Sequence, residues 1–243
     1  MQVQSPRVGD HVKVPVDLLL PIKPLARAKT RLRGAADHGA GDPTAHARLV
    51  VALARDTIAA AAGASLVRRT VAICTDRLVC RILADDGIEA IAGEPGGGIN
   101  SALQYGETLL RAADPTTAVA AMPADLPALR PSELDCAVRD ALATGGRAFC
   151  ADQARTGTTL LLAPPGHPLD PRFGTGSAAA HQASGARPLT GRWPGLRCDV
   201  DTAADLARAH ELGLGRFTHD ALHVHAANIS PRRKFTVHPC DIA

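Results

Sequence analysis

Short apolar runs alternate with longer mixed stretches along most of this chain. The apolar runs have the length of buried strands and occupy residues 14–22, 70–76, 88–93, 117–122, 147–151 and 158–163. The stretches predicted as helices occupy residues 45–62, 78–85, 101–113 and 177–184. Strands that alternate with helices are typical of an α/β fold, so we expect a mostly parallel sheet with helices on both faces.

Several element ends are marked by capping residues. A further helix is expected after "RPSEL", with Ser132 as its N-cap, and "GLRCDVD" at residues 195–201 is expected to end the last strand. Thr202 should cap the helix that follows, and Gly213 should close it. These elements fall in one domain over residues 13–216. We expect a loose leader at 1–12 and a flexible tail at 217–243.

Composition narrows the function classes. Hydrophobic residues make up 46% of the 243 residues, which indicates a globular chain, and the net charge is only +3. Aromatic residues are 2%, too few for a stacking surface, so we expect no nucleic-acid partner. No apolar run approaches the ~20 residues of a membrane span and no signal pattern is present, so we expect a cytoplasmic protein.

The six cysteines are widely scattered. They lie at 74, 80, 136, 150, 198 and 240, and no two form a C-x-x-C pair. Reduced thiols are therefore expected, in preference to a disulfide framework.

Polar residues follow the predicted strands closely. In open parallel sheets, ligands bind in the crevice at the carboxyl ends of the strands. Lys23, Asp76, the glycines at 96–98, Asp125 and Asp199 all come directly after strands, so we expect them to gather at that edge.

The segment after the first strand, "KPLARAKTRL", is basic. Lys23, Arg27 and Lys29 lie in it, together with further arginines at 31 and 33. Like charges so close together are costly unless an anion lies between them, which favours a polyphosphate ligand. A solvated basic loop is the alternative.

A glycine-rich loop, "GEPGGGIN", precedes the third predicted helix. Gly96, Gly97 and Gly98 would let main-chain N–H groups approach a nucleotide, and the helix start favours anions. Asn100 could bind a base or ribose. The loop is neither G-x-G-x-x-G nor a Walker A motif, so an ordinary flexible loop remains the alternative.

Two carboxylates at strand ends are suited to a metal ion. Asp125 ends the run "AVAAMPADLP", and Asp199 lies in "RCDVDT". Mg²⁺ is commonly held by one or two carboxylates together with substrate phosphates. Asp201 could share this site or belong to the turn before the next helix. The segments 156–159 and 173–177, rich in glycine and small hydroxyls, could bind a second anion.

The chain resembles the guanylyltransferases of coenzyme F-420 biosynthesis, which act on phosphoenolpyruvate or 2-phospho-L-lactate. The resemblance is carried by six stretches in this order: "LLLPIKPLARAKTRL", "GGGIN", "MPADLPAL", "GTT", "PRFGTGS" and "GLRCDVDT". The resemblance covers residues 14–215. It implies a single-domain, Rossmann-like nucleotidyltransferase that transfers GMP from GTP to a three-carbon phospho-acid and releases pyrophosphate.

The resemblance also implies roles for single residues. Asp125 and Asp199 would bind Mg²⁺, and Thr158, Gly174 and Ser177 would bind the phospho-acid, with Thr159 as a neighbour in an ambiguous register. Lys23, with its basic neighbours, would hold the nucleotide phosphates and complete the catalytic set. GTP and the phospho-acid are the expected partners, without a membrane; a homo-oligomer is left open.

Two alternative functions also fit the sequence. One is a nucleotidyltransferase of the sugar-phosphate or molybdenum-cofactor type, although such families carry glycines directly after the first strand, where this chain has none before Gly34. Another is a non-catalytic nucleotide-binding module. Among acceptors, phosphoenolpyruvate is favoured over 2-phospho-L-lactate and 3-phosphoglycerate, because the Ala-, Arg- and Gly-rich composition suggests an actinobacterial genome.

Overall fold

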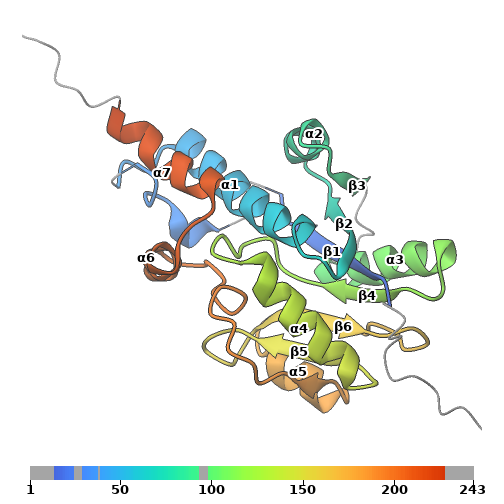
Figure 1. Cartoon of the computed structure of the whole chain (residues 1–243). Coiled ribbons are helices and arrows are strands. Elements are labelled where there is room, and N and C mark those ends of the chain that lie inside the picture. The colour runs from blue at the N-terminus through green and yellow to red at the C-terminus, as the bar shows by residue number, and fades with distance from the viewer. Residues whose placement is uncertain (1–13, 25–28, 38, 93–97, 228–243) are drawn as a thin grey trace, which may run out of the picture.

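The computed structural model describes residues 14–24, 29–37, 39–92 and 98–227 (Figure 1). The strands are β1 (Val16–Ile22), β2 (Val67–Cys74), β3 (Glu89–Ala92), β4 (Ala118–Ala121), β5 (Ala148–Ala151), β6 (Thr158–Ala163) and β7 (Arg187–Pro188). The helices are the short 3-10 helix η2 (Thr30–Leu32), α1 (Pro43–Ala62), α2 (Arg77–Asp85), α3 (Gly98–Ala113), α4 (Pro131–Ala143), α5 (Ser177–Ala183), α6 (Ala203–Leu212) and α7 (Arg216–Ala227).

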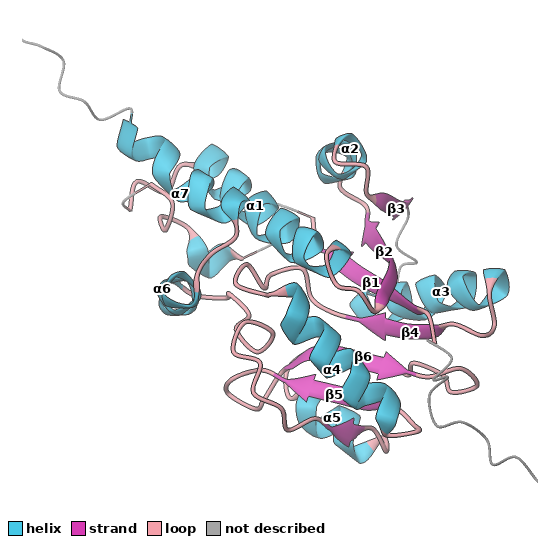
Figure 2. Ribbon diagram, viewed as in Figure 1, coloured by secondary structure: helices cyan, strands magenta, loops and turns pink. Residues whose placement is uncertain are grey.

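The strands form one sheet in the order β3-β2-β1-β4-β6-β5-β7 (Figure 2). Strands β1 to β4 are parallel, and β5 runs parallel to β7. Only β6 is antiparallel to both of its neighbours. The predicted α/β class, with a mostly parallel sheet, is therefore confirmed. The carboxyl ends of β1, β4 and β5 share an edge with the beginning of β6.

Helices cover both faces of the sheet. Strand β1 shows why, because its alternate residues enter different cores. Leu18 and Leu20 pack in the core that includes residues of α1, α2 and α4, whereas Leu19 packs in the core that includes residues of α3 and α5. A smaller cluster joins α1 and η2 to α6 and residues 198–200. Within the described ranges, no helix combines the length and apolar character needed to cross a bilayer.

Two predicted element boundaries are wrong. Residues 195–201 form a turn followed by irregular backbone, not a strand. The N-cap position of helix α4 is Arg130 and not Ser132, and the Arg130 side chain makes no capping hydrogen bond. Pro131 occupies the first helical position, where its missing N–H costs nothing. Thr202 does cap α6, in a reciprocal capping box with Asp205, and Gly213 closes that helix.

The fold continues past residue 216, where the tail was expected to begin. Residues 216–227 form α7, which lies along α1 (Figure 1). The carboxylate of Asp56, in α1, accepts hydrogen bonds from the main-chain N–H groups of Phe217 (3.0 Å) and Thr218 (2.7 Å). The side chain of one helix thus caps the start of another. Residues 1–12 and 228–243 lie outside the described residues.

The cysteines depart from the expectation of reduced thiols at one place. Cys74, at the end of β2, forms a disulfide with Cys80 in α2. Cys136, Cys150 and Cys198 are free thiols.

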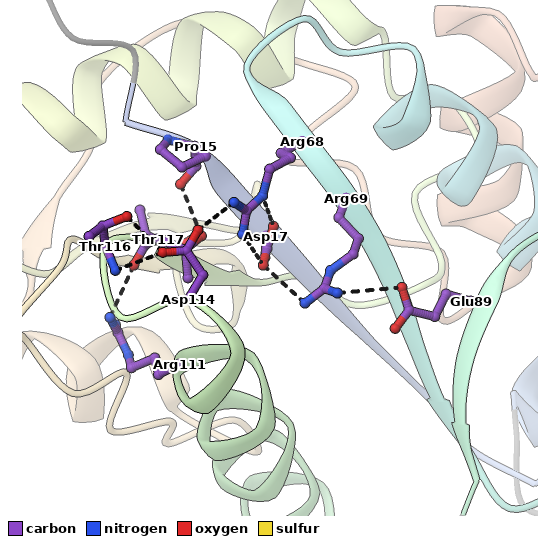
Figure 3. A network of polar contacts seen from close by, with 10 residues as sticks. Pro15, Asp17, Arg68, Arg69, Glu89, Arg111, Asp114, Thr116 and Thr117 are labelled. Carbon is purple, nitrogen blue, oxygen red and sulfur yellow. Dashed lines mark hydrogen bonds and ion pairs between the residues drawn. The ribbon is translucent and has the colours of Figure 1, made fainter.

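A buried carboxylate ties the first two strands together at the amino-terminal end of β1 (Figure 3). Asp17 is completely buried and accepts two hydrogen bonds from Arg68, at 2.9 and 2.8 Å, and one from Arg69 at 3.2 Å. Arg68 also pairs with Asp114, which follows α3. The network lies at the end of β1 opposite to the carboxyl edge.

Candidate active site

The loop after β4 is fixed on both sides, and this positions Asp125. Met122 continues the pairing with β1, since its N–H donates to the carbonyl of Leu19 at 3.0 Å. The N–H of Leu126 donates to the hydroxyl of Thr57, a buried residue of α1, at 2.8 Å. Asp125 therefore lies between two anchored residues at the carboxyl edge of the sheet.

A single main-chain hydrogen bond brings the second acidic segment to this loop. The N–H of Val200 donates to the carbonyl of Asp125 at 3.0 Å. Asp199 and Asp201 flank Val200 and are thereby placed beside Asp125, although no strand carries them. The side chain of Asp201 does not cap α6, because Thr202 and Asp205 perform that function.

Lys29 links the two segments. Its ammonium group forms ion pairs with Asp125 and with Asp201, and its side chain is only 15% exposed. Burial alone would lower the pKa of Lys29, but Asp125 and Asp201 outweigh it and raise that pKa above its usual value. Lys29 has a left-handed backbone (φ 51°), which is uncommon for a residue other than glycine and directs the chain into η2.

The site carries more negative charge than Lys29 neutralises. Burial, followed by repulsion from Asp125, Asp152 and Asp201, raises the pKa of Asp199 to about 7. The Oδ1 atom of Asp125 is buried and has no hydrogen-bond partner among the described residues. A raised carboxyl pKa and an unpaired carboxylate oxygen both indicate that the site can take another cation.

Part of the basic segment reaches the same edge. Lys23 is exposed just after β1. Burial would raise the pKa of Asp201, but its hydrogen bond to Lys29, supported by the charges of Lys23 and Arg31, lowers it. These cations therefore face the acidic cluster. Arg27 lies outside the described residues.

The glycine loop is described only at its end. Gly96 and Gly97 lie outside the described residues, and Gly98 begins α3 with φ +81°. The side chain of Asn100 binds Phe173, accepting from its N–H at 2.8 Å and donating to its carbonyl at 3.1 Å. The amide of Asn100 thus joins the start of α3 to the 173–177 loop, a use that differs from the predicted contact with a base or ribose.

The three residues expected to bind the phospho-acid come together. Thr158 begins β6, and Ser177 begins α5, where its N–H donates to the carbonyl of Gly174 at 3.1 Å. The next N–H of α5, from Ala178, donates to the carbonyl of Thr156 at 3.1 Å. The hydroxyl of Thr159 instead donates to the carbonyl of Cys150 on β5, away from this group.

Three supporting residues were missed from the sequence. Thr57 anchors the Asp125 loop. Asp152 accepts from the N–H groups of Thr156 and Gly157, both at 2.8 Å, and so shapes the turn before β6. His181 bonds to Thr158. Thr57 and His181 contact segments that are distant in the sequence, so no local motif marked them, whereas the bonds of Asp152 are local to its own turn.

Asp76 was expected at the site but caps α2, accepting from the N–H groups of Leu78 and Val79.

A pocket of about 860 Å³ opens beside the 152–157 turn, lined in part by Asp152, Ala178 and Trp193. Neither Asp125 nor Asp199 lines it.

The carboxylates of the site are suited to a divalent cation only together with ligands from outside the protein. In the described part of the chain, no three Asp, Glu, His or Cys side chains already converge on one point. Mg²⁺ requires less from a protein, because one or two carboxylates suffice when waters and phosphate oxygens complete its shell. The free Oδ1 of Asp125 and the raised pKa of Asp199 fit such a site.

Comparison with solved structures identifies the fold. The structure is similar to a 4-diphosphocytidyl-2C-methyl-D-erythritol synthase from Anaerococcus prevotii, with a TM-score of 0.52 and 10% identity over 82% of this chain and 96% of that one. It is also similar to a cytidylyltransferase from Leptospira borgpetersenii, with a TM-score of 0.50 and 16% identity over 94% and 100%. The fold is the Rossmann-like nucleotidyltransferase fold.

Comparison with curated sequences is more specific, although no family model matches the chain. A phosphoenolpyruvate guanylyltransferase from Streptomyces scabiei is 47% identical over 82% of this chain and 91% of its own length. Relatives of the same name from Geodermatophilus obscurus and Salinispora arenicola are 46% and 44% identical, covering 91% and 89% of their lengths. The chain is a nucleotidyltransferase and belongs to the phosphoenolpyruvate guanylyltransferase family.

Proposed function

We propose that this enzyme transfers GMP from GTP to the phosphate of phosphoenolpyruvate and releases pyrophosphate, as a step of coenzyme F-420 biosynthesis. The observation that carries the proposal is the meeting of Asp125 with the 199–201 segment beside Lys29, in a chain 44–47% identical to phosphoenolpyruvate guanylyltransferases. No feature of the site favours another function.

The proposed reaction needs no general base. A phosphate oxygen of the acid attacks the α-phosphorus of GTP, and a new P–O bond forms. The bond between the α-phosphorus and the bridging oxygen breaks, and its electron pair leaves with pyrophosphate. Because the second pKa of a phosphate monoester is about 6, the attacking oxygen is already an anion at neutral pH. The enzyme has to position two anions and offset their repulsion.

The basic residues would provide part of that charge compensation. Lys23 is exposed directly after β1, and the Lys29 ammonium pairs with Asp125 and Asp201. In the proposed complex, these two side chains and Arg27 hold the nucleotide phosphates and the leaving pyrophosphate. Gly96, Gly97 and Gly98 are predicted from the sequence to bind the nucleotide through their main-chain N–H groups.

Asp125 and Asp199 would hold Mg²⁺. The Oδ1 of Asp125 has no donor among the described residues, while its other carboxylate oxygen pairs with Lys29, and Asp199 would lose its proton on binding a cation. Bound Mg²⁺ supplies charge neutralisation at the nucleotide phosphates. The main-chain bond between Val200 and Asp125 holds together the two segments that carry these carboxylates.

Thr158, Gly174 and Ser177 would bind the phospho-acid. They come together from β6, the 173–177 loop and the start of α5, and they offer small donors without bulk. The relatives' shared name supports phosphoenolpyruvate as the acceptor.

The test is the substitution Asp125→Asn, which keeps the size of the side chain but removes its charge. Pyrophosphate release from GTP plus phosphoenolpyruvate with Mg²⁺ should fall at least ~100-fold, since a group that neutralises transition-state charge is lost. Asp85→Asn, at an exposed position of α2, is the matched control and should behave as the wild type.

Substrate choice is tested in the same assay. ATP and CTP replace GTP, 2-phospho-L-lactate and 3-phosphoglycerate replace phosphoenolpyruvate, and mass spectrometry identifies the product. Near-normal turnover by Asp125→Asn would contradict the metal assignment. Faster turnover with another nucleotide or acid would contradict the substrate assignment.

A further inference from the structure

His181 is a fully buried histidine of α5 that the reaction scheme above does not use. Its ring lies near those of Phe149 and Phe173, with ring centroids 5.9 and 5.2 Å away. Both ring nitrogens nevertheless have partners. Nδ1 lies 2.9 Å from the hydroxyl oxygen of Thr158, and Nε2 lies 2.9 Å from the main-chain nitrogen of Arg172.

These two contacts determine where the ring carries its proton. A main-chain N–H can only donate, so Nε2 must accept from Arg172 and cannot itself be protonated. A neutral imidazole carries one proton, which must then be on Nδ1. The ring therefore donates from Nδ1–H, and the hydroxyl oxygen of Thr158 accepts.

The surroundings support the neutral ring. Burial, followed by the charge of Arg147, lowers the pKa of His181 to about 4. The carbonyl of Ser177 also interacts with the ring, and a carbonyl can only accept. That contact agrees with a protonated Nδ1, because Nε2 is already occupied by Arg172.

The consequence falls on Thr158. A free hydroxyl can rotate to donate or accept, but here the oxygen accepts from His181, and its hydrogen must point elsewhere. In the described part of the chain, His181 is the one hydrogen-bond partner recorded for this hydroxyl. We propose that His181 is a positioning residue that fixes the Thr158 hydroxyl as a hydrogen-bond donor to the phosphorylated acid.

This inference rests on the proposed function, which places Thr158 beside the acid. A phosphate or carboxylate only accepts hydrogen bonds, so a hydroxyl already committed as a donor is complementary to it. The same ring holds Arg172, directly before the loop that Asn100 binds through Phe173. His181 therefore aligns a donor and secures one end of the loop that carries Gly174.

The first test does not depend on activity. Long-range ¹⁵N–¹H spectra of the full-length protein, compared with those of His181→Asn, identify the ring signals of His181. We expect the neutral Nδ1–H form from pH 5.5 to 8. An Nε2–H form, or titration near pH 6.5, would overturn the proposal.

The second test separates the two contacts of the ring. In His181→Asn, the side-chain NH₂ can replace Nδ1 as donor to Thr158, whereas in His181→Gln an oxygen can replace Nε2 as acceptor from Arg172. We expect the KM for phosphoenolpyruvate to stay within about threefold of the wild type for Asn and to rise about tenfold for Gln, with the KM for GTP unchanged. The reverse order would overturn the proposal.

A double-mutant cycle asks whether His181 acts through Thr158. Thr158→Val should raise the KM for phosphoenolpyruvate about tenfold, and Thr158→Ser should retain most of the binding. Adding His181→Gln to Thr158→Val should change the KM for phosphoenolpyruvate little. A further tenfold rise in that KM would overturn the proposal. If the wild type transfers no GMP, the proposed function fails, while the spectra still decide how the ring is protonated.

Discussion

The charge balance around Asp125 depends on one lysine. The Lys29 ammonium lies where it contacts Asp125 and Asp201 together, beside an Asp199 whose pKa is already raised. A divalent cation bound by the same carboxylates would compete with this ammonium for Asp125. Lys29 therefore stabilises the metal-free protein, and its removal should make that protein more dependent on Mg²⁺.

We expect Lys29→Met to lower the stability of the metal-free protein by about 1–3 kcal/mol, because two close carboxylates lose their charged donor. That corresponds to a fall in Tm of roughly 2–4 °C per kcal/mol in a chain of this size. Adding Mg²⁺ should raise the Tm more in this variant than in the wild type. Thermal denaturation with and without Mg²⁺ measures both effects. Lys23→Met, at an exposed position, should show neither the loss of stability nor the larger rise in Tm with Mg²⁺. An equal rise in Tm with Mg²⁺ in the wild type and both variants would refute the competition between Lys29 and Mg²⁺.

The buried His181 predicts a pH dependence of stability. Its pKa is about 4 in the folded protein, where Arg147, Arg172 and Asp170 face it, and about 6.5 in the unfolded chain. Between these values the unfolded chain binds the proton more readily, so the contribution of His181 to stability is complete above pH 6.5 and is lost as the pH falls towards 4. The loss approaches about 3 kcal/mol.

Urea denaturation at several pH values measures this loss. In His181→Asn, which cannot titrate, the decline in stability between pH 6.5 and 4 should be shallower by that amount. Parallel pH profiles for the wild type and the variant would show that the native ring is not held neutral.

The sequence located Asp125 but not its contacts. A lone acid after a buried run places a carboxylate at the ligand edge, because strand ends and edges follow from the hydrophobic pattern. The contact with Lys29 depends on a left-handed backbone at a residue other than glycine, and the bond from His181 to Thr158 depends on how α5 packs. No local spacing encodes either.

Among the elements, the runs rich in β-branched and aliphatic residues were predicted well, and the segment 195–201 was not. Its alternation resembles that of a strand, but its main-chain groups bond elsewhere: Val200 to Asp125, and the Arg197 carbonyl to Gln153. Tertiary bonds of this kind override local preference. These bonds place Asp199 at the predicted edge of the sheet, although the sequence predicted a strand there instead of tertiary main-chain contacts.

Helix α7 is held at its start by a carboxylate from another helix. Asp56→Ala would leave the N–H groups of Phe217 and Thr218 without their acceptor. We expect a loss of about 1.5–3 kcal/mol in the free energy of unfolding, measured with urea, because both bonds have a charged acceptor. Hydrogen exchange should quicken in α7 first. Asp56→Asn should lower the free energy of unfolding by less than Asp56→Ala does. If hydrogen exchange in α7 of Asp56→Ala is as slow as in the wild type, packing alone holds the helix.

At the scale of the whole molecule, the buried Asp17 network and the acidic cluster lie at opposite ends of the parallel strands. The Asp17 network lies at the amino-terminal end of β1 (Figure 3). The acidic cluster lies beyond the carboxyl end of the parallel strands. The overall class was predictable because strand and helix alternation is a property of the entire chain. The reversal of β6 was not, since an apolar run reads the same in either direction.

Asp17→Ala tests that separation. It removes the buried partner of Arg68 and Arg69 and should cost about 3 kcal/mol, measured by urea denaturation. The KM values for GTP and phosphoenolpyruvate should not change in the folded enzyme. Asp114→Asn, at the exposed end of the same network, should have a much smaller effect. A large rise in either KM would show that the two ends of the sheet are coupled.

The bond between Val200 and Asp125 joins two segments through main-chain atoms alone. Any residue except proline at position 200 supplies the same N–H, and every residue at position 125 supplies the same carbonyl. The main-chain contact that holds the two segments together therefore does not depend on which side chains they carry. Substitution at 125, 199 or 201 changes the charge that the site offers to a cation without removing the main-chain bond that joins the two segments.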